Sequence, residues 1–189
     1  MNIFCNFHCW IPSIFAIDNE YKVTIKNEIH NLNRHKYSKL YNIYIPIIFK
    51  KMVPMFEAAM NTVLKNSQFK VIVQIKDYEI NDKDLFIGGI HKDGLFEKIE
   101  GIGIYYYRID SNIIGGDLEL HACITTNDGH ENHGYKMRKR IIPIKEGNVV
   151  VFNNAKTYHK VTETKLKNGK IGHRKAILFF VIKDQEFEN

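Results

Sequence analysis

The sequence has few cysteines, no low-complexity tract and no apolar run that approaches the length of a membrane span. Three cysteines are an odd and sparse set, which argues against a disulfide framework and favours a reducing environment. The N-terminus lacks a basic segment followed by an uninterrupted apolar run, because Asn6, His8 and Pro12 interrupt the candidate segment. We therefore expect a cytoplasmic protein with no signal peptide and no membrane partner.

The composition is that of a folded globule. The chain has 189 residues, of which 44% are hydrophobic and 12% aromatic, enough for a packed, strand-rich core. We expect one domain over residues 1–189, with a strand and helix support region at 1–66 and a β core at 67–184. The net charge of +6 would help attract an anionic partner. It permits a nucleic acid, but no basic stripe with interleaved aromatic residues supports one.

One amphipathic helix is predicted between Lys36 and about Lys65, because apolar residues recur there at intervals of three and four. Pro46 and Pro54 should kink or divide it, since each removes a backbone donor. Its expected role is to cover one face of a sheet. A short alternating segment, Tyr21 to Ile25, precedes it and is predicted to form a strand.

From Ser67 onward the apolar residues alternate or form short runs, which is typical of strands. Turn-forming residues such as Asn, Gly and Ser separate the runs. The pattern favours a mainly β sandwich or barrel, with a ligand site at its mouth. The predicted strands are Phe69 to Ile80, Phe86 to His91, Ile102 to Ile109, Asp117 to Ile124, Arg140 to Ile144, Asn148 to Phe152, Tyr158 to Thr162 and Lys175 to Lys183.

The strongest candidate site is His91-Lys92-Asp93 together with the distant His159. If residues 88–93 form a strand, alternation puts the His91 and Asp93 side chains on one side and Lys92 on the other. A histidine from a neighbouring strand would complete a set of two histidines and one carboxylate, which binds Fe(II) on one face and leaves positions open for substrates. His159 is the natural donor. His-x-Asp alone is a weak signal that any strand end can carry by chance.

Arg174 lies at the start of the last apolar strand. Alternation puts it on one face with Ala176, Leu178 and Phe180, and puts Lys175 on the other face. A partly buried guanidinium needs an anion, and its planar fork matches the far carboxylate of a dicarboxylate cosubstrate. Without the histidines upstream, a surface arginine beside a hairpin would be the better interpretation.

Tyr105 and Tyr107 share a face of their predicted strand with Gly101 and Gly103, which would leave space beside them. Either phenol could donate a hydrogen bond to the cosubstrate. The sequence does not distinguish the two, and simple packing inside a barrel explains each tyrosine equally well.

Other polar clusters carry weaker signals. Cys5, His8 and Cys9 lack a second ligand pair at zinc-finger spacing, so buried thiols are favoured. Residues 125–138 are polar and predict a long surface loop, on which His130 and His133 are expected to be solvated rather than bound to a second metal. Asn154, near His159, could orient a ligand or form a turn, and the turn is favoured.

These motifs resemble, in order, the Fe(II)- and 2-oxoglutarate-dependent oxygenases that have a double-stranded β-helix fold. The motifs are His91-x-Asp93, Gly115-Gly116-Asp117-Leu118-Glu119-Leu120, His159 and Arg174. A narrower resemblance, from about residue 7 to 182, is to a mainly fungal domain family of unknown function related to those oxygenases. The segments that carry it are Trp10 to Ser13, Asn27 to Leu32, Gly101 to Tyr107 and Val149 to Asn154. This chain is much shorter than that family and has Asp93 where many members have glutamate and His121 where arginine is common.

The resemblance implies a jelly-roll, cupin-like β-helix with an N-terminal helical segment on one sheet. It implies a dioxygenase that uses Fe(II), 2-oxoglutarate and O2 to hydroxylate or demethylate a substrate that the sequence does not identify. His91, Asp93 and His159 would hold iron, while Arg174 with Tyr105 or Tyr107 would hold 2-oxoglutarate. The first alternative is a non-catalytic binding or scaffold module with the same fold. The second is a cupin-type metalloenzyme that does not use 2-oxoglutarate, in which Arg174 would face solvent or pair with a carboxylate.

Overall fold

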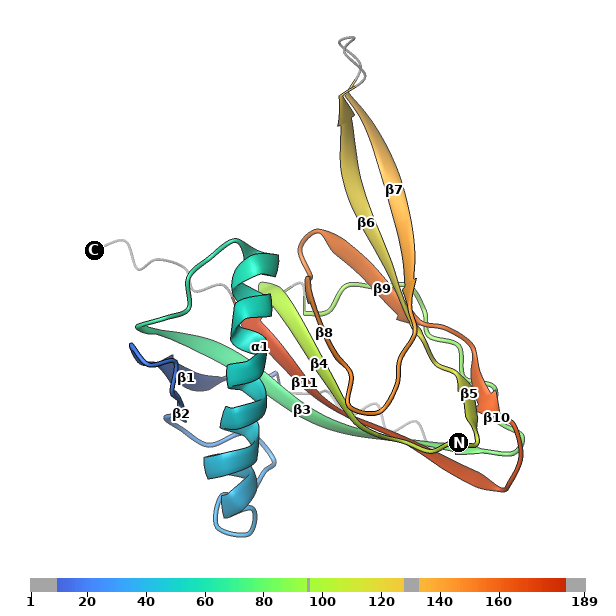
Figure 1. Ribbon diagram of the computed structural model, residues 1–189, viewed down its shortest axis with the longest axis horizontal. Coiled ribbons are helices and arrows are strands. Elements are labelled where there is room, and N and C mark those ends of the chain that lie inside the picture. The colour runs from blue at the N-terminus through green and yellow to red at the C-terminus, as the bar shows by residue number, and fades with distance from the viewer. Residues whose placement is uncertain (1–9, 95, 128–132, 183–189) are drawn as a thin grey trace.

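A computed structural model describes residues 10–94, 96–127 and 133–182, with side chains omitted for 123–127 and 133–136. It is mainly β, as expected, with one long helix near the N-terminus (Figure 1). The helical elements are a π-helical turn η1 (Leu40–Tyr44) and the helix α1 (Ile45–Met60). The strands are β1 (Ser13–Ile17), β2 (Val23–Ile25), β3 (Ser67–Asn81), β4 (Ile99–Ile109), β5 (Ile113–Gly115), β6 (Leu118–Asn127), β7 (His133–Ile142), β8 (Val149–Asn153), β9 (Thr157–Val161), β10 (Thr164–Leu166) and β11 (Ile171–Ile182).

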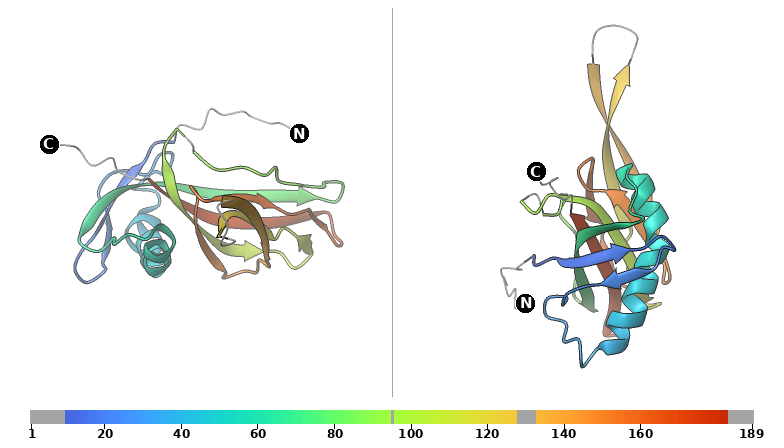
Figure 2. Two further views of the ribbon diagram at one scale, coloured as in Figure 1. Left: turned by 90° about the horizontal axis from the view of Figure 1, so that it is seen from above. Right: turned by 90° about the vertical axis from the view of Figure 1, so that its left-hand side faces the viewer.

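The strands form two facing layers. The larger is a six-stranded antiparallel sheet in the order β2-β1-β3-β11-β4-β8. The smaller layer is a three-stranded sheet in the order β7-β6-β9, with the short β5-β10 pair near its end. In the views of Figures 1 and 2, α1 lies against one face of the large sheet, away from the small sheet. This is the predicted jelly-roll architecture.

The helix forms where the apolar stripe predicted it, over a shorter range. Pro46 lies in the first turn of α1, where a missing backbone N–H leaves no helical hydrogen bond unmade. Pro54 lies inside α1 and does not divide it. The helix ends at Asn61, which adopts a left-handed conformation with φ of 53°. No helix in the described part of the chain is long and apolar enough to cross a membrane.

Two apolar cores lie on opposite faces of the large sheet. One, between the sheet and α1, includes Phe49, Phe56 and Phe179, all fully buried. The other lies between the two sheets and includes Tyr106 and Phe180. Because the large sheet is buried on both faces, its strands carry near-continuous apolar sequences instead of a clean alternation.

Three predicted segments differ from the structure. Residues 86–91 do not form a regular strand: Phe86 and His91 make isolated antiparallel bridges to Thr164 and His159. The predicted loop at 125–138 is instead a β-hairpin, because β6 continues to Asn127 and β7 begins at His133. Figure 1 shows this hairpin projecting from the body of the molecule. The predicted strand at Lys175 starts earlier, at Ile171.

Candidate metal centre

A cavity of about 240 Å³ lies between the two sheets and contains the predicted site. His91, Asp93, His159 and Arg174 all line it. Much of the remaining wall is apolar, with side chains from β4, β6 and β11 and from the N-terminal segment: Trp10, Ile104, Leu118, Leu178 and Phe180. Trp10 packs edge-on against Phe180, with ring centroids 5.0 Å apart. A polar set in an apolar pocket is the usual composition of a ligand site.

His91, Asp93 and His159 converge in this cavity. One ligand atom from each lies within 4.8 Å of the other two. Asp93 Oδ2 is 3.2 Å from His159 Nε2, and Asp93 Oδ1 is 3.6 Å from His91 Nε2. Neighbouring ligand atoms around an octahedral ion are about 3 Å apart when each lies about 2.1 Å from the metal. The three side chains therefore need little movement to contact one ion.

The backbone around His91 explains how two distant segments meet. His91 N donates to His159 O at 3.0 Å, and His159 N donates to His91 O at 2.9 Å. Nearby, Gly88 N donates to Val161 O, and a Cβ at Gly88 would lie only 2.8 Å from Val161 N. Only glycine fits this close approach without a shift.

The His91 ring is oriented by its own segment. Its Nδ1 lies 2.7 Å from the carbonyl oxygen of Gly89. A carbonyl oxygen only accepts, so Nδ1 carries the proton and the neutral ring presents the Nε2 lone pair to the cavity. Nε2 is the atom that faces Asp93.

Asn154 fixes the backbone of Asp93, beyond the turn predicted for it. Its side chain is buried and accepts from Asp93 N at 3.2 Å while donating to Asp93 O at 2.7 Å. A further hydrogen bond to Ile99 O, at 3.0 Å, ties this group to β4. Groups that orient a metal ligand in this way contribute to metal affinity.

Arg174 lies inside the molecule, as its alternation on β11 predicted, and is only 5% exposed. Its Nη2 donates to Gly116 O at 3.1 Å, while Nε has no hydrogen-bond partner among the described residues. The guanidinium carbon lies 4.8 Å from the Tyr106 ring centroid and 5.8 Å from that of Tyr78. Within the described chain it pairs with no carboxylate. A buried cation without a counter-ion suits an anionic ligand.

The two tyrosines predicted to line the cavity do not reach it. Tyr105 and Tyr107 pack with the core under α1 and line a groove beside that helix, on the opposite face of β4 from the cavity. Tyr106 faces the cavity instead. Burial raises the pKa of Tyr106, and burial likewise raises that of Tyr78. Both phenols therefore remain protonated donors at neutral pH.

Gly101 and Gly103 do not open a pocket either. Added Cβ atoms there would lie 2.6 Å from Met60 Sδ and 2.6 Å from Phe56 Cζ. The two glycines instead let α1 approach β4 closely.

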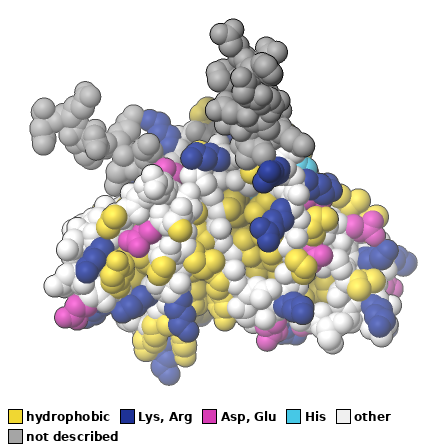
Figure 3. Space-filling model, turned by 45° about the horizontal axis from the view of Figure 1, so that its top comes forward, with side chains coloured by type: hydrophobic (Ala, Val, Ile, Leu, Met, Phe, Trp, Pro, Cys, Tyr) yellow, Lys and Arg dark blue, Asp and Glu magenta, His cyan; other side chains and the backbone are white. Residues whose placement is uncertain are grey.

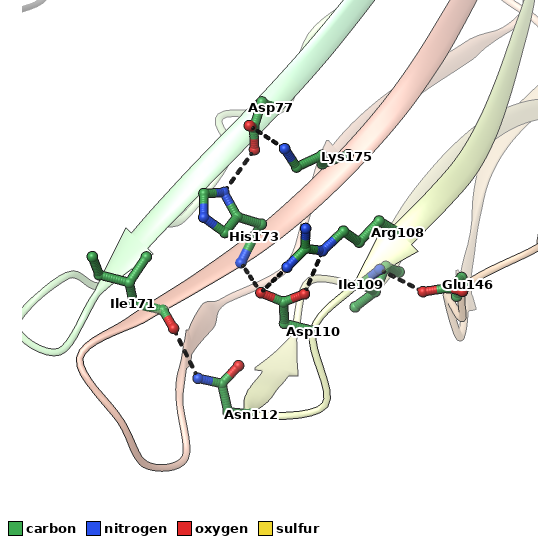
Figure 4. A network of polar contacts seen from close by, with 9 residues as sticks. All are labelled: Asp77, Arg108, Ile109, Asp110, Asn112, Glu146, Ile171, His173 and Lys175. Carbon is green, nitrogen blue, oxygen red and sulfur yellow. Dashed lines mark hydrogen bonds and ion pairs between the residues drawn. The ribbon is translucent and has the colours of Figure 1, made fainter.

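A polar network on the outer side of β11 holds the start of that strand (Figure 4). Asp77 on β3 contacts His173 Nδ1 at 3.0 Å and Lys175 Nζ at 2.7 Å. Asp110 accepts from the backbone N of His173 and from the side chain of Arg108. The pKa values of Asp77 and Asp110 are lowered, chiefly by hydrogen bonds from Lys175 and Arg108 respectively. With His173 and Lys175 held outside, Arg174 between them points inward.

Two weaker metal candidates lie wholly or partly outside the described side chains. Cys5, His8 and Cys9 lie outside the described residues, as does His130. His133 begins β7, but its side chain is not described.

None of the known family models matches the chain, and no curated protein matches it. Several solved structures are similar, including these three. IDO from Bacillus thuringiensis superposes with a TM-score of 0.60 at 16% identity, covering 92% of this chain and 73% of that one. A bsmA homolog from Methylobium petroleophilum PM1 gives 0.55 at 8% identity, covering 91% and 69%. TqaL, an Fe(II)/α-ketoglutarate-dependent dioxygenase, gives 0.56 at 11% identity, covering 94% and 67%.

The chain has the double-stranded β-helix fold. At these identities the likeness extends to the fold alone, and fold does not fix function.

Proposed function

We propose that this protein is an Fe(II)- and 2-oxoglutarate-dependent dioxygenase that hydroxylates or demethylates a substrate. The observation that carries the proposal is the meeting of His91, Asp93 and His159 in one cavity with the buried Arg174. The likeness in fold to a dioxygenase of this cofactor class agrees with it.

The donor set fits iron. Two imidazoles and one carboxylate on one side of an ion are typical of non-haem Fe(II) oxygenases, which keep other coordination positions open. His91 presents the required lone pair, since its Nδ1 proton is donated to Gly89 O. His159 is 6% exposed, and Asn154 holds Asp93. We infer that His91, Asp93 and His159 are the metal ligands.

The far end of the cavity fits a dicarboxylate. Arg174 has an unpartnered Nε in the described structure and can grip a carboxylate through two parallel hydrogen bonds. Tyr106, beside it and protonated, can donate a further hydrogen bond. We infer that Arg174 and Tyr106 hold the distal carboxylate of 2-oxoglutarate, with Tyr106 in the role first assigned to Tyr105 or Tyr107.

When bound, Fe(II) and 2-oxoglutarate would supply the oxidising chemistry, in which O2 is consumed, 2-oxoglutarate becomes succinate and CO2, and a substrate C–H bond is hydroxylated. The chain's own residues orient these groups. Arg174 and Tyr106 fix one end of the cosubstrate, while Ile104, Leu178 and Phe180 give the cavity dry walls. Excluding water from the site suppresses side reactions.

The test is an anaerobic titration of the metal-free protein with Fe(II) and then 2-oxoglutarate, followed by succinate measurement in air. A visible ligand-to-metal absorption band should appear only when both are present. Asp93→Ala should abolish it through loss of iron. Arg174→Ala should still bind iron, but its affinity for 2-oxoglutarate should fall by roughly tenfold or more. Arg174→Lys should be intermediate, since it keeps the charge without the fork.

Lys175→Ala is the matched control, because Lys175 is the next residue on β11 and pairs with Asp77 outside the cavity. It should leave both titrations unchanged. Iron binding without succinate formation under any substrate panel would instead support the non-catalytic module. No iron binding at all would refute the proposal.

The cupin-type alternative without 2-oxoglutarate expects Arg174 in solvent or paired with a carboxylate. Arg174 is buried, and no carboxylate of the described chain contacts it. This observation favours the 2-oxoglutarate proposal over that alternative.

A further inference from the structure

Two arginines on the edge strand of the small sheet share a face with the metal-site histidine. In the register of β6 with β9, Leu120 lies opposite His159 and Ala122 opposite Thr157. In the register of β6 with β7, the same residues lie opposite Arg140 and Arg138. Directly opposed residues of antiparallel strands project to one side of the sheet. Arg140 and Arg138 therefore project to the side that carries His159.

That side is the inner face of the small sheet. Leu118, His159 and Val161 all lie on it and line the cavity. Lys139, between the two arginines, projects outward and contacts Glu119 Oε2 at 2.9 Å. The described basic side chains of β7 therefore lie on two different faces. Lys139 pairs with Glu119 on the outer face, whereas Arg138 and Arg140 project toward the side of the cavity.

The inward arginines are exposed, and within the described part of the chain neither forms an ion pair or a hydrogen bond. Two residues apart on a strand, their Cα atoms lie about 7 Å from each other. Arg140 is two strands away from His159, so the Cα atoms of this pair are about 10 Å apart. A guanidinium at the end of a long side chain can therefore reach an anion close to the metal site.

Other basic side chains lie near Arg138 and Arg140. In Figure 3, Lys and Arg side chains gather beside the base of the β6–β7 hairpin. Arg174, the other cavity arginine, lies on β11 in the large sheet and donates to Gly116 O. Arg138 and Arg140 are on the opposing sheet, so their anion would be a different one from the anion held by Arg174.

We propose that Arg138 and Arg140 bind an anionic group, a carboxylate or a phosphate, on the primary substrate and so hold its reacting carbon near the metal. This inference rests on the proposed function, because it identifies the chemistry of the substrate for the same cavity. Guanidinium groups recognise both oxyanions through paired hydrogen bonds.

The probes are inorganic phosphate and acetate, titrated into protein loaded with Mn(II) and saturated with 2-oxoglutarate in the absence of oxygen. The cosubstrate occupies Arg174, so added anions report on the remaining cations. Paramagnetic relaxation of the phosphorus or the acetate carbon measures both affinity and closeness to the metal. At least one anion should bind saturably and relax rapidly, and which of them does so distinguishes a phosphate from a carboxylate.

The double variant Arg138→Gln/Arg140→Gln should weaken that binding roughly tenfold or more, because two charge-assisted contacts are lost. Lys22→Gln/Lys26→Gln, beside β2 at the far edge of the large sheet, removes the same charge and should behave like the unaltered protein. The inference is overturned if neither anion binds saturably, if both double variants behave alike, or if the bound anion shows no relaxation by the metal.

The same titrations on metal-free protein, followed by phosphorus line width, separate the two proposals. If Mn(II) does not bind, the dioxygenase proposal fails while arginine-dependent anion binding is still measured. If Mn(II) binds and the arginine variant has no effect on either anion, only the substrate inference fails.

Discussion

At the residue scale, Tyr106 shows why burial matters for the proposed chemistry. Its ring lies against the Arg174 guanidinium, and burial keeps its phenol protonated. A protonated phenol beside a guanidinium adds a second donor to the carboxylate end of the cavity. Tyr105 has the same side chain one residue earlier but lies under α1.

The two tyrosines therefore make a matched pair of variants. Tyr106→Phe removes the hydroxyl in the cavity and should raise the KM for 2-oxoglutarate by roughly tenfold or more, because one hydrogen bond to a charged group is lost. Tyr105→Phe should leave that KM unchanged. Succinate formation at varied 2-oxoglutarate measures both. Equal effects of the two substitutions would contradict the assignment of the cavity face.

The sequence singled out His91, Asp93, His159 and Arg174 because their side-chain types are chemically distinctive, and the structure brings all four to one cavity. The sequence did not predict which tyrosine faces the cavity, because β4 is buried on both faces and its hydrophobic pattern does not distinguish them. The turn predicted at Asn154 is present, but the contacts of its side chain were not predicted. Its hydrogen bonds to Asp93 depend on a contact 61 residues away in the chain.

At the element scale, the packing of α1 on β4 depends on glycine. A Cβ at Gly103 would lie 2.6 Å from Phe56 Cζ and 2.9 Å from Met52 Cε. Gly103→Ala should destabilise the protein by about 1–3 kcal/mol through overpacking. Gly89→Ala is the control, since nothing lies within 4 Å of a Cβ there. Urea unfolding measures the difference, and Phe56→Leu in the Gly103→Ala background should recover part of the loss.

The two element-level errors have physical causes. Residues 86–91 were expected to be a strand, and their two bridges do share one antiparallel register: Phe86 pairs with Thr164 and His91 with His159. The segment that they face is interrupted between β9, which ends at Val161, and β10, which begins at Thr164, so no continuous ladder forms although His91 still meets His159. The hairpin at 125–138 was expected to be a loop because β7 carries mostly polar residues there. A projecting hairpin exposes both faces, so it need not show an apolar alternation.

At the scale of the whole molecule, the metal site would join an irregular segment to the small sheet. His91 and Asp93 belong to that segment and His159 to β9. A metal that binds only the folded state stabilises it by about 2.7 kcal/mol at a hundredfold excess over its Kd. We expect Mn(II) to raise the free energy of unfolding by about that amount, and a chelator to reverse it.

The variant that tests this linkage is Asp93→Ala, which should lose the metal-dependent increment. Asp84→Ala, which removes an exposed carboxylate in a distant turn, should keep it. Urea unfolding with and without Mn(II) measures both. An equal increment in the two variants would place the metal elsewhere.

Acid should weaken the outer face of the small sheet. Lys139 chiefly, with His121, lowers the pKa of Glu119 from 4.5 to about 2. A carboxyl group whose pKa is lower in the folded state stabilises the fold above its unfolded pKa, and that contribution is lost as pH falls from about 4.5 toward 2.

Glu119→Gln should therefore be less stable than the unaltered protein at pH 6, and the difference should shrink below pH about 4. Glu163→Gln, which removes an exposed carboxylate from a pair with Lys165, should show a much smaller difference at pH 6. Unfolding followed across this pH range would contradict the assignment if the Glu119 difference stayed constant down to pH about 2.

The order of the strands has a consequence for synthesis. β11 follows every other described strand in the chain, yet it lies between β3 and β4 and carries Arg174. While the chain is still emerging from the ribosome, β3 and β4 each expose an unpaired edge that β11 covers in the folded protein. A nascent chain stalled before Ile171 would therefore offer open strand edges to other chains. Arg174, on β11, would be the last of the proposed ligand-binding residues to be synthesised.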